Sequence, residues 1–315
     1  GIKLRTIGIL CGMIPIANLI ALYFIIKATA GECILESTRQ QRNLLRKNDR
    51  VCATKYPIVL VHGVFFRDSR FFNYWGRIPK ELEDNGAQIF YGNHPSAASV
   101  ADSAAILKER IEEVLSQTGA EKVNIIAHSK GGLDCRYSIS ELGAGEYIAS
   151  LTTINTPHRG CIFAEYLLNK ISPDLQKRVA DAYNSASKKL GDTDPDFLTA
   201  VRQLTFSHCA QLNQKLKPPP EGIYCQSVGS VMKKAKGGKF PLNFSHRIVK
   251  HYDGENDGLV GENSFSWGEK YTCLRPQGNK GISHGDMIDL NRENIKDFDV
   301  RAFYTELVSD LRQKG

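Results

Sequence analysis

The chain has 315 residues, of which 42% are hydrophobic and 24% are charged. This is an ordinary globular composition, and the length suits one large domain or two small ones. The net charge of +7 is modest, and its basic clusters at 39–50 and 233–239 are not interleaved with aromatic residues. We therefore expect no nucleic-acid partner.

The first 30 residues contain the one targeting signal. The stretch Thr6–Ile26 is uncharged and about long enough to cross a hydrocarbon core of ~30 Å, with Lys3 and Arg5 before it. A small-x-small sequence at 28–30 resembles a signal cleavage site. We predict a signal-anchor or transmembrane helix over 1–30, with a cleaved signal peptide as the alternative. Either interpretation places the rest of the chain outside the cell membrane or in the medium.

Residues 31–52 are polar and basic, and we predict a basic linker or a loosely packed helix there. Because the sequence begins with Gly rather than Met, we also expect a short piece of the N-terminus to precede it. The globular part is expected over 53–315. Its first apolar run, 56–63, is rich in Val and Ile, as is typical of a strand covered on both faces.

Strands and helices alternate along this globular part. Further strands are predicted at 87–92, 122–129, 148–158 and 222–231, and the basic run flanked by His246 and His251 is also strand-like. A helix is predicted at 99–117 from one apolar stripe, and the apolar residues from 300 to 311 predict a terminal helix. This alternation indicates a mostly parallel sheet flanked by helices.

Residues 159–221 break the alternation, and we predict that they form a helical lid or cap insertion. They lie between two predicted strands, so they would overhang the edge of the sheet where those strands end. Apolar residues recur in the first helix at Ile162, Phe163, Tyr166, Leu167 and Leu168. We predict that Ile162, Phe163 and Leu167 contact the substrate, and the alternative is that they are ordinary core.

An apolar strand ends in a serine at Ala127-His128-Ser129-Lys130-Gly131, a small-x-Ser-x-Gly motif. Small residues on either side let the strand and the next helix approach closely, which lifts the serine into an exposed, strained turn. A plain strand–helix turn with a capping serine is the alternative. The apolar strand before the motif and Gly132 after it favour Ser129 as a nucleophile.

A nucleophile in such a turn is followed along the chain by an acid and then by a histidine. Of the histidines after Ser129, only His284 comes late, in a glycine-flanked loop before the terminal helix. Asp257, in a turn-rich Asn-Asp-Gly, is our candidate acid, and Asp253 is the runner-up. We therefore predict Ser129, Asp257 and His284 as a catalytic triad.

A serine nucleophile also needs donors for the oxyanion that it creates. One is the backbone N–H after the nucleophile, from Lys130. The other is predicted to be the N–H of Val64, after the turn at Gly63, although this turn could simply end a strand. Aromatic residues crowd behind it: Phe65, Phe66, Phe71, Phe72 and Trp75. We predict that Phe65 and Phe66 line an apolar acyl pocket; the alternative is that these aromatic residues belong to the hydrophobic core.

Taken together, these residues resemble the bacterial true lipases of the α/β-hydrolase fold, especially the Gram-positive branch with Ala-x-Ser-x-Gly. The matching stretches run in order from 56 to 307: "YPIVLVHG", "NYWG", "IIAHSKGG", "LTTINTPHRG", "ENDGLV", "SHGD" and "FDVRAFYTEL". The resemblance implies a mostly parallel central sheet with a helical lid insertion. It also implies Ser129 as nucleophile, Asp257 as acid and His284 as base, with Val64 and Lys130 as oxyanion donors.

The resemblance bears on metals in two ways. Larger members of this family bind zinc through an insertion that contains histidine, and here the chain passes from Trp75 to Gln88 without one, so no zinc is expected. The family also binds a structural calcium near the catalytic histidine. Asp286 fits one of its ligand positions, and the other ligands in the family are mostly backbone carbonyls.

The expected function is that of a membrane-anchored or secreted serine carboxylic-ester hydrolase. It would be a lipase or esterase that cleaves acylglycerols or similar lipophilic esters through an acyl-enzyme, and the chemistry needs no cofactor. Its partners would be a lipid or small ester and, through the N-terminal helix, a membrane. An acyltransferase or thioesterase with the same triad is one alternative, and a non-catalytic surface-anchored binding protein is another.

Overall fold

The computed structural model describes residues 15–46, 48–64, 73–189, 192, 194–239, 241–275, 277–278, 280–295 and 298–314. Its strands are β1 (Ile58–Val61), β2 (Ile89–Tyr91), β3 (Val123–His128), β4 (Ile148–Ile154), β5 (Tyr224–Ser230) and β6 (Lys270–Leu274). Its α-helices are α2 (Pro15–Arg46), α3 (Ile78–Asp84), α4 (Val100–Thr118), α5 (Lys130–Glu141), α6 (Ile162–Lys170), α7 (Pro173–Lys189), α8 (Phe197–Arg202), α9 (Phe206–Lys215), α10 (Leu242–Asp253) and α11 (Val300–Lys314).

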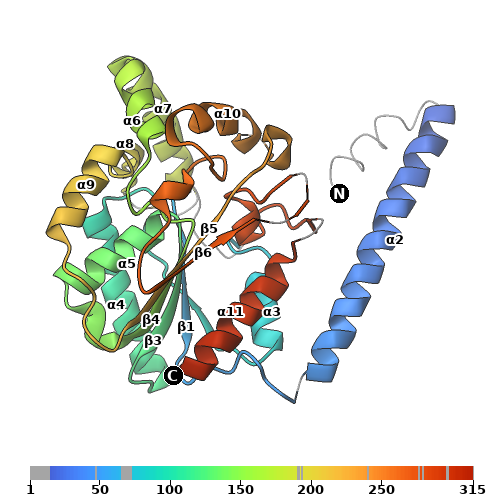
Figure 1. Ribbon diagram of the computed structural model, residues 1–315, viewed down its shortest axis with the longest axis horizontal. Helices are drawn as coiled ribbons and strands as arrows, with labels where there is room; N and C mark the ends of the chain where they lie inside the picture. The colour runs from blue at the N-terminus through green and yellow to red at the C-terminus, as the bar shows by residue number, and fades with distance from the viewer. Residues whose placement is uncertain are drawn as a thin grey trace.

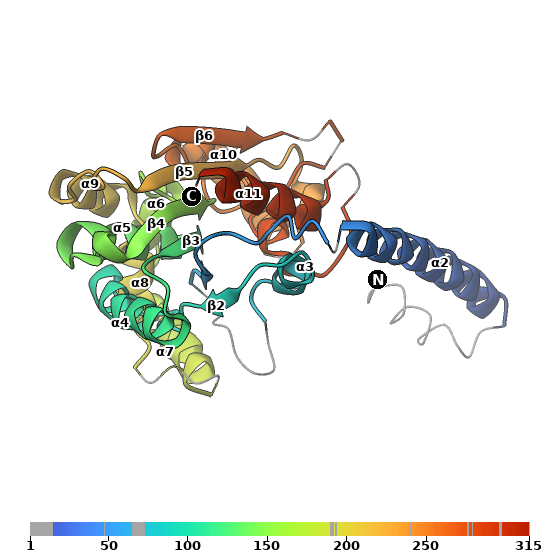
Figure 2. The same ribbon diagram turned by 90° about the horizontal axis from the view of Figure 1, so that it is seen from below.

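The strands form one parallel sheet in the order β2-β1-β3-β4-β5-β6 (Figure 1). Side chains alternate between the two faces of a strand. Ile58 and Leu60 of β1 therefore join the core under α3 and α11, whereas Val59 and Val61 join the core under α4 and α5. Figure 2 shows these two helix pairs on opposite sides of the sheet. The predicted α/β architecture is confirmed.

The structure differs from the sequence interpretation in two elements of this domain. Residues 246–251 look like a basic strand in sequence but lie within α10. Its buried residues, His246 and Val249, are three positions apart, which is a helical spacing. Strand β6 at the edge of the sheet was not predicted, because none of its residues is fully buried and its pattern is weakly apolar.

Four helices, α6 to α9, lie between β4 and β5. They fall within 159–221, where the helical insertion is predicted. Helix α6 has no buried residue, and Ile162 and Leu167 are 43% and 40% exposed. These two side chains are therefore not ordinary core. The domain boundaries themselves stay predictions.

Helix α2 continues well past residue 30 and ends at Arg46, so most of the predicted linker 31–52 is helical. It is the one helix among the described residues that is long and apolar enough to cross a membrane. In Figure 1 its N-terminal half stands clear of the rest of the molecule. A signal sequence would have the same length and composition, so the helix alone does not separate an anchor from a signal.

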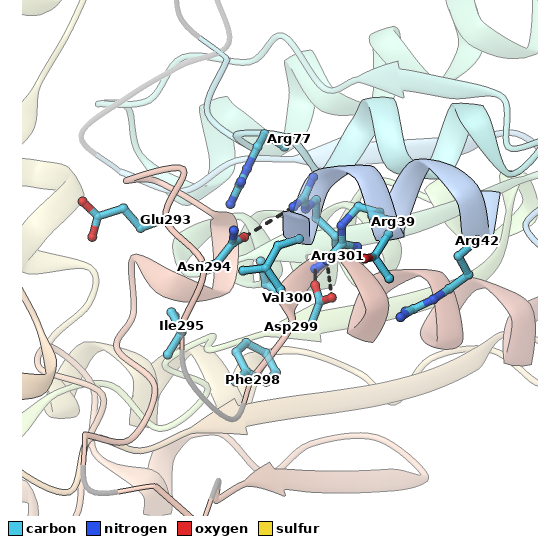
Figure 3. Close-up of a pocket in the computed structure, with 12 residues that line it drawn as sticks. Arg39, Arg42, Arg77, Glu293, Asn294, Ile295, Phe298, Asp299, Val300 and Arg301 are labelled. Atoms are coloured by element: carbon cyan, nitrogen blue, oxygen red, sulfur yellow. Dashed lines mark hydrogen bonds and ion pairs between the residues drawn. The ribbon is translucent and has the colours of Figure 1, made fainter. Parts of the chain in front are cut away.

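The C-terminal half of α2 contacts the remainder of the chain through charged side chains. Glu36 pairs with Arg301 at 2.5 Å and with Arg77 at 3.3 Å, and Arg39 pairs with Asp299. A cavity of about 150 Å³ lies at this junction between α2 and the start of α11 (Figure 3). We call this contact the α2 junction.

Candidate active site

Ser129 lies between β3 and α5, at the carboxyl edge of the sheet. Its φ of +56° and ψ of −129° are unusual for a residue with a side chain, and the backbone there is strained. The N–H of Ser129 donates to the carbonyl of Ile154 at the end of β4, at 2.9 Å. The turn is therefore fixed to the neighbouring strand, as a strand-to-helix nucleophile turn requires.

Two glycines allow the backbone to approach this turn closely. A Cβ on Gly131 would lie 2.4 Å from the carbonyl oxygen of His62, and a Cβ on Gly63 would lie 2.7 Å from the Cβ of Ser129. The segment that carries Val64 therefore packs directly against the nucleophile turn. Val64 and Lys130, whose N–H groups are the predicted oxyanion donors, are both buried beside it. The predicted pocket residues Phe65 and Phe66 lie outside the described residues.

The structure brings together the predicted acid and base. The Nδ1 of His284 lies 2.5 Å from Oδ2 of Asp257, and the two residues are 7% and 0% exposed. The other carboxylate oxygen of Asp257 accepts the N–H groups of Leu259 and Val260 at 2.9 and 2.8 Å. With Nδ1–H donating to the carboxylate, His284 has Nε2 left as a proton acceptor.

Asn155 also binds the acid, and no sequence signal identified it. It follows β4, and its Nδ2 lies 2.6 Å from Oδ2 of Asp257 and 2.8 Å from Oγ of Ser230. The residue is fully buried and has a φ of +48°. Asn155 therefore holds the carboxylate in place from the side of β4.

His128 connects the nucleophile turn to the base, and it was also missed. Its ring lies against that of His284, with centroids 4.4 Å apart, and its Nδ1 bonds the hydroxyl of Tyr74 at 2.7 Å. Burial lowers the pKa of His128 well below its usual value, and the neighbouring His284 lowers it further. A neutral His128, the residue next to Ser129 in sequence, thus packs against His284 without adding a competing charge.

The runner-up acid, Asp253, has a different position. Its two carboxylate oxygens accept the N–H groups of Ile162 and Phe163, each at 2.9 Å. These are the first residues of α6, whose unpaired N–H groups a carboxylate can satisfy. Burial raises the pKa of Asp253. Asp253 therefore fastens the first insertion helix to α10 and does not contact His284.

Asp286 lies in the loop after His284, where the resemblance places a calcium ligand. Its Oδ2 accepts the N–H of Ser283 at 2.9 Å, and burial raises the pKa of its carboxyl group. Within the part of the chain that the structure describes, no group of three or more His, Cys, Asp or Glu side chains could hold a metal ion. A calcium site made mostly of backbone carbonyls stays a prediction.

The geometry can be compared with known proteins. The family model for lipase (class 2) matches residues 55–153. A triacylglycerol lipase of Pseudarthrobacter phenanthrenivorans is 35% identical over 187 residues, which cover 56% of this chain and 57% of that protein. A triacylglycerol lipase of Pseudomonas fragi is 29% identical over 299 residues, which cover 83% of this chain and 98% of that protein. The chain thus spans little more than half of the first of these relatives.

Among solved structures, the mature form of the Bacillus licheniformis lipase BlEst2 matches with a TM-score of 0.60. It is 22% identical and the match covers 81% of this chain and 92% of that chain, so the likeness bears on the fold alone. The fold is that of the α/β-hydrolases, with a strained serine turn and, later in the chain, an Asp–His pair at the carboxyl edge of one parallel sheet. Within this class the chain is similar to the class 2 lipases over residues 55–153, and membership of the bacterial true lipase family stays a prediction. The Gram-positive branch stays a prediction.

Proposed function

We propose that the chain is a serine carboxylic-ester hydrolase, a lipase or esterase that cleaves acylglycerols or similar lipophilic esters. The single observation that carries the proposal is the buried Asp257–His284 pair, whose histidine ring packs against the residue preceding Ser129. The triacylglycerol lipases that the chain resembles support the same reaction class.

In the proposed reaction, the Oγ of Ser129 attacks the ester carbonyl and its proton passes to Nε2 of His284. The Asp257 carboxylate stabilises the imidazolium that forms. The backbone N–H groups of Val64 and Lys130 stabilise the oxyanion of the tetrahedral intermediate. The alcohol leaves with the proton from His284, and water then releases the acid from the acyl-enzyme by the same steps.

We also propose that the catalytic domain lies outside the cell membrane and that α2 anchors it there. Helix α2 is long and apolar enough to span a bilayer, and its N-terminal half stands clear of the domain. In Figure 1 this half and the insertion helices α6 and α7 point toward the same side of the molecule. A substrate held in that membrane would therefore meet the insertion first. Cleavage after residue 30 would give a secreted enzyme instead.

Ser129→Ala tests the reaction class. We expect it to lower hydrolysis of a p-nitrophenyl ester at least ~10⁴-fold, because loss of a triad member has about this effect. An unchanged melting temperature would show that the fold is intact. A fluorophosphonate probe should label wild type and leave the variant unlabelled. Residual turnover within about tenfold of wild type would rule out Ser129 as the nucleophile.

Leu167→Ser tests the preference for lipophilic esters. Leu167 is exposed on α6, so a serine there should cost little stability but should weaken contact with a long acyl chain or a lipid surface. We expect C16 ester hydrolysis to fall far more than C2 ester hydrolysis. Equal losses on both esters would assign α6 no role in substrate selection. Val179→Ser on α7, also exposed, is a matched control for the loss of apolar surface.

A further inference from the structure

A cluster of buried polar side chains lies directly behind the nucleophile turn. Lys130 and Asp134 are each 1% exposed and form an ion pair of 2.7 Å between Nζ and Oδ1. They are one turn apart on α5. The Lys130 ammonium also donates to the Oγ of Ser103 on α4 at 3.0 Å, so it is held by two helices.

The pair continues toward the loop that carries the other predicted oxyanion donor. The second oxygen of Asp134 faces Nε2 of His94 at 3.5 Å. The rings of His94 and His62 are stacked, with centroids 4.1 Å apart. His62 Nε2 lies 3.0 Å from the carbonyl oxygen of His94, and His62 Nδ1 lies 2.9 Å from that of Gly63. The contacts therefore run without a break from Lys130 to the residue before Val64.

A buried ion pair at this position is not explained by stability. Removing two charges from water costs free energy that their attraction often fails to recover, and apolar residues of similar size are frequently as good. Burial raises the pKa of Asp134 to about 6, and the Lys130 ammonium opposes that rise. The free-energy cost of burying charge therefore falls on Lys130, whose backbone N–H is a predicted oxyanion donor, and on its partner Asp134.

We propose that Lys130 and Asp134 are positioning residues whose buried ion pair, through His94 and His62, holds the two oxyanion donors at a fixed separation. This rests on the proposed ester hydrolysis. The Lys130 side chain ties the first residue of α5 to the body of the protein, so its own N–H cannot tilt. The stacked His94 and His62 fix the carbonyl of Gly63, and therefore the peptide that presents the N–H of Val64.

Such fixing matters because an oxyanion hole works through donors that are already in place when charge develops. A displacement of about 1 Å in a catalytic group can lower the rate ~100-fold. The ion pair affects the reaction only by positioning the two backbone N–H donors. Its loss should therefore reduce kcat and the binding of tetrahedral mimics, and should leave the KM for substrate nearly unchanged.

The test is the double variant Lys130→Met/Asp134→Leu, which replaces both charges with apolar groups and leaves neither charge buried alone. We expect its melting temperature to stay within a few degrees of wild type. Its kcat for a p-nitrophenyl ester should fall by about 10- to 100-fold, with KM changed less than twofold. Its affinity for a trifluoromethyl ketone, which forms a tetrahedral adduct with the serine, should fall by a similar factor.

Lys80→Met/Asp84→Leu is the matched control. Lys80 and Asp84 form an ion pair of 3.0 Å with the same spacing on α3, but both are exposed, so kcat and ketone affinity should not change. If the first double variant does not fold, Lys130→Met decides: it removes the ammonium, and Asp134, whose pKa is raised by burial and lowered by Lys130, can then take up a proton and become neutral. The same loss of kcat and ketone affinity in that variant would support the proposal.

A folded double variant, or Lys130→Met, with kcat and ketone affinity within twofold of wild type would overturn the positioning role. Failure of the proposed function gives a different result. In that case wild type itself would neither hydrolyse the ester nor react at Ser129 with the fluorophosphonate probe.

Discussion

The carboxyl edge of the sheet and the α2 junction both pair acidic with basic side chains, but only the first removes both partners from water. At the sheet edge, Asp257 is fully buried and His284 is 7% exposed. At the α2 junction, the side chains of Glu36 and Asp299 are 39% and 41% exposed, although the Arg301 that binds Glu36 is mostly covered. Acidic and basic side chains are therefore paired out of contact with water at the sheet edge, whereas the acidic partners at the α2 junction stay partly exposed to solvent.

The difference follows from solvent screening. An exposed ion pair contributes roughly 0–1 kcal/mol, because water and salt weaken the attraction and two flexible side chains must be ordered. A buried charge that loses its partner is strongly destabilising, and a buried hydrogen bond can fix which nitrogen of a histidine carries the proton. The sheet edge is therefore suited to holding a reactive geometry, and the α2 junction to holding the domain against its helix.

The largest effect is expected for Asp257→Asn. The amide offers His284 an N–H donor where a carboxylate acceptor was, so the wrong histidine tautomer is favoured and kcat should fall by ~10⁴. Steady-state ester hydrolysis measures this.

Asp253→Asn is the matched control, because it makes the same change in the nearby carboxylate at the start of α6. Asparagine keeps one of the two acceptor oxygens that bind the start of α6, so some stability should be lost. The value of kcat should stay within a few-fold of wild type, because Asp253 binds α6 and not His284. If the two variants ranked in the opposite order, Asp253 would be the acid, and the contrast between a reactive and a structural carboxylate would be lost.

The predictability of these residues depends on how local their signals are. Ser129 stands in a short motif, and its partners follow in a known chain order, so Asp257 and His284 can be found from sequence. Asn155 cannot, because it reaches Asp257 only through the pairing of β4 with β5, which sets Ile154 beside Val228. The partners of Glu36 are equally remote, since Arg301 is 265 residues away along the chain.

The misread segment in α10 has a related cause. Ile248 and Val249 are β-branched and favour strands, so local propensity suggested the wrong element. In the structure His246 and Val249 are buried on one side of a helix, and Asp253 at its end fastens α6. Tertiary packing overrides local preference there.

A smaller effect is expected for Glu36→Gln at the α2 junction. Glutamine keeps an acceptor for Arg301 and Arg77 but loses the charge, so the free energy of unfolding should fall by about 1 kcal/mol or less. Urea unfolding at low salt measures this, and the difference should shrink in 1 M salt, where the Debye length is about 3 Å.

Glu109→Gln, at an exposed position on α4, is the control for loss of one negative charge. A decrease of about 3 kcal/mol or more in the free energy of unfolding for Glu36→Gln alone would show that the α2 junction behaves like a buried ion pair. The two regions would then not differ in this respect.

The smallest effect on catalysis is expected from deleting residues 1–30. This removes the apolar half of α2 but keeps Glu36, Arg39 and Asn43, whose side chains bind the domain. We expect a soluble protein with kcat on a C4 ester within twofold of the full chain, because no residue of 16–30 is buried and this part of α2 stands clear of the catalytic domain in Figure 1. Deleting residues 1–46 is the matched comparison, since it also removes the α2 junction and should lower the melting temperature further. Sedimentation with bilayer vesicles completes the test. If the protein lacking residues 1–30 still sediments as strongly as the full chain, α2 is not the anchor, and membrane contact must come from the catalytic domain itself.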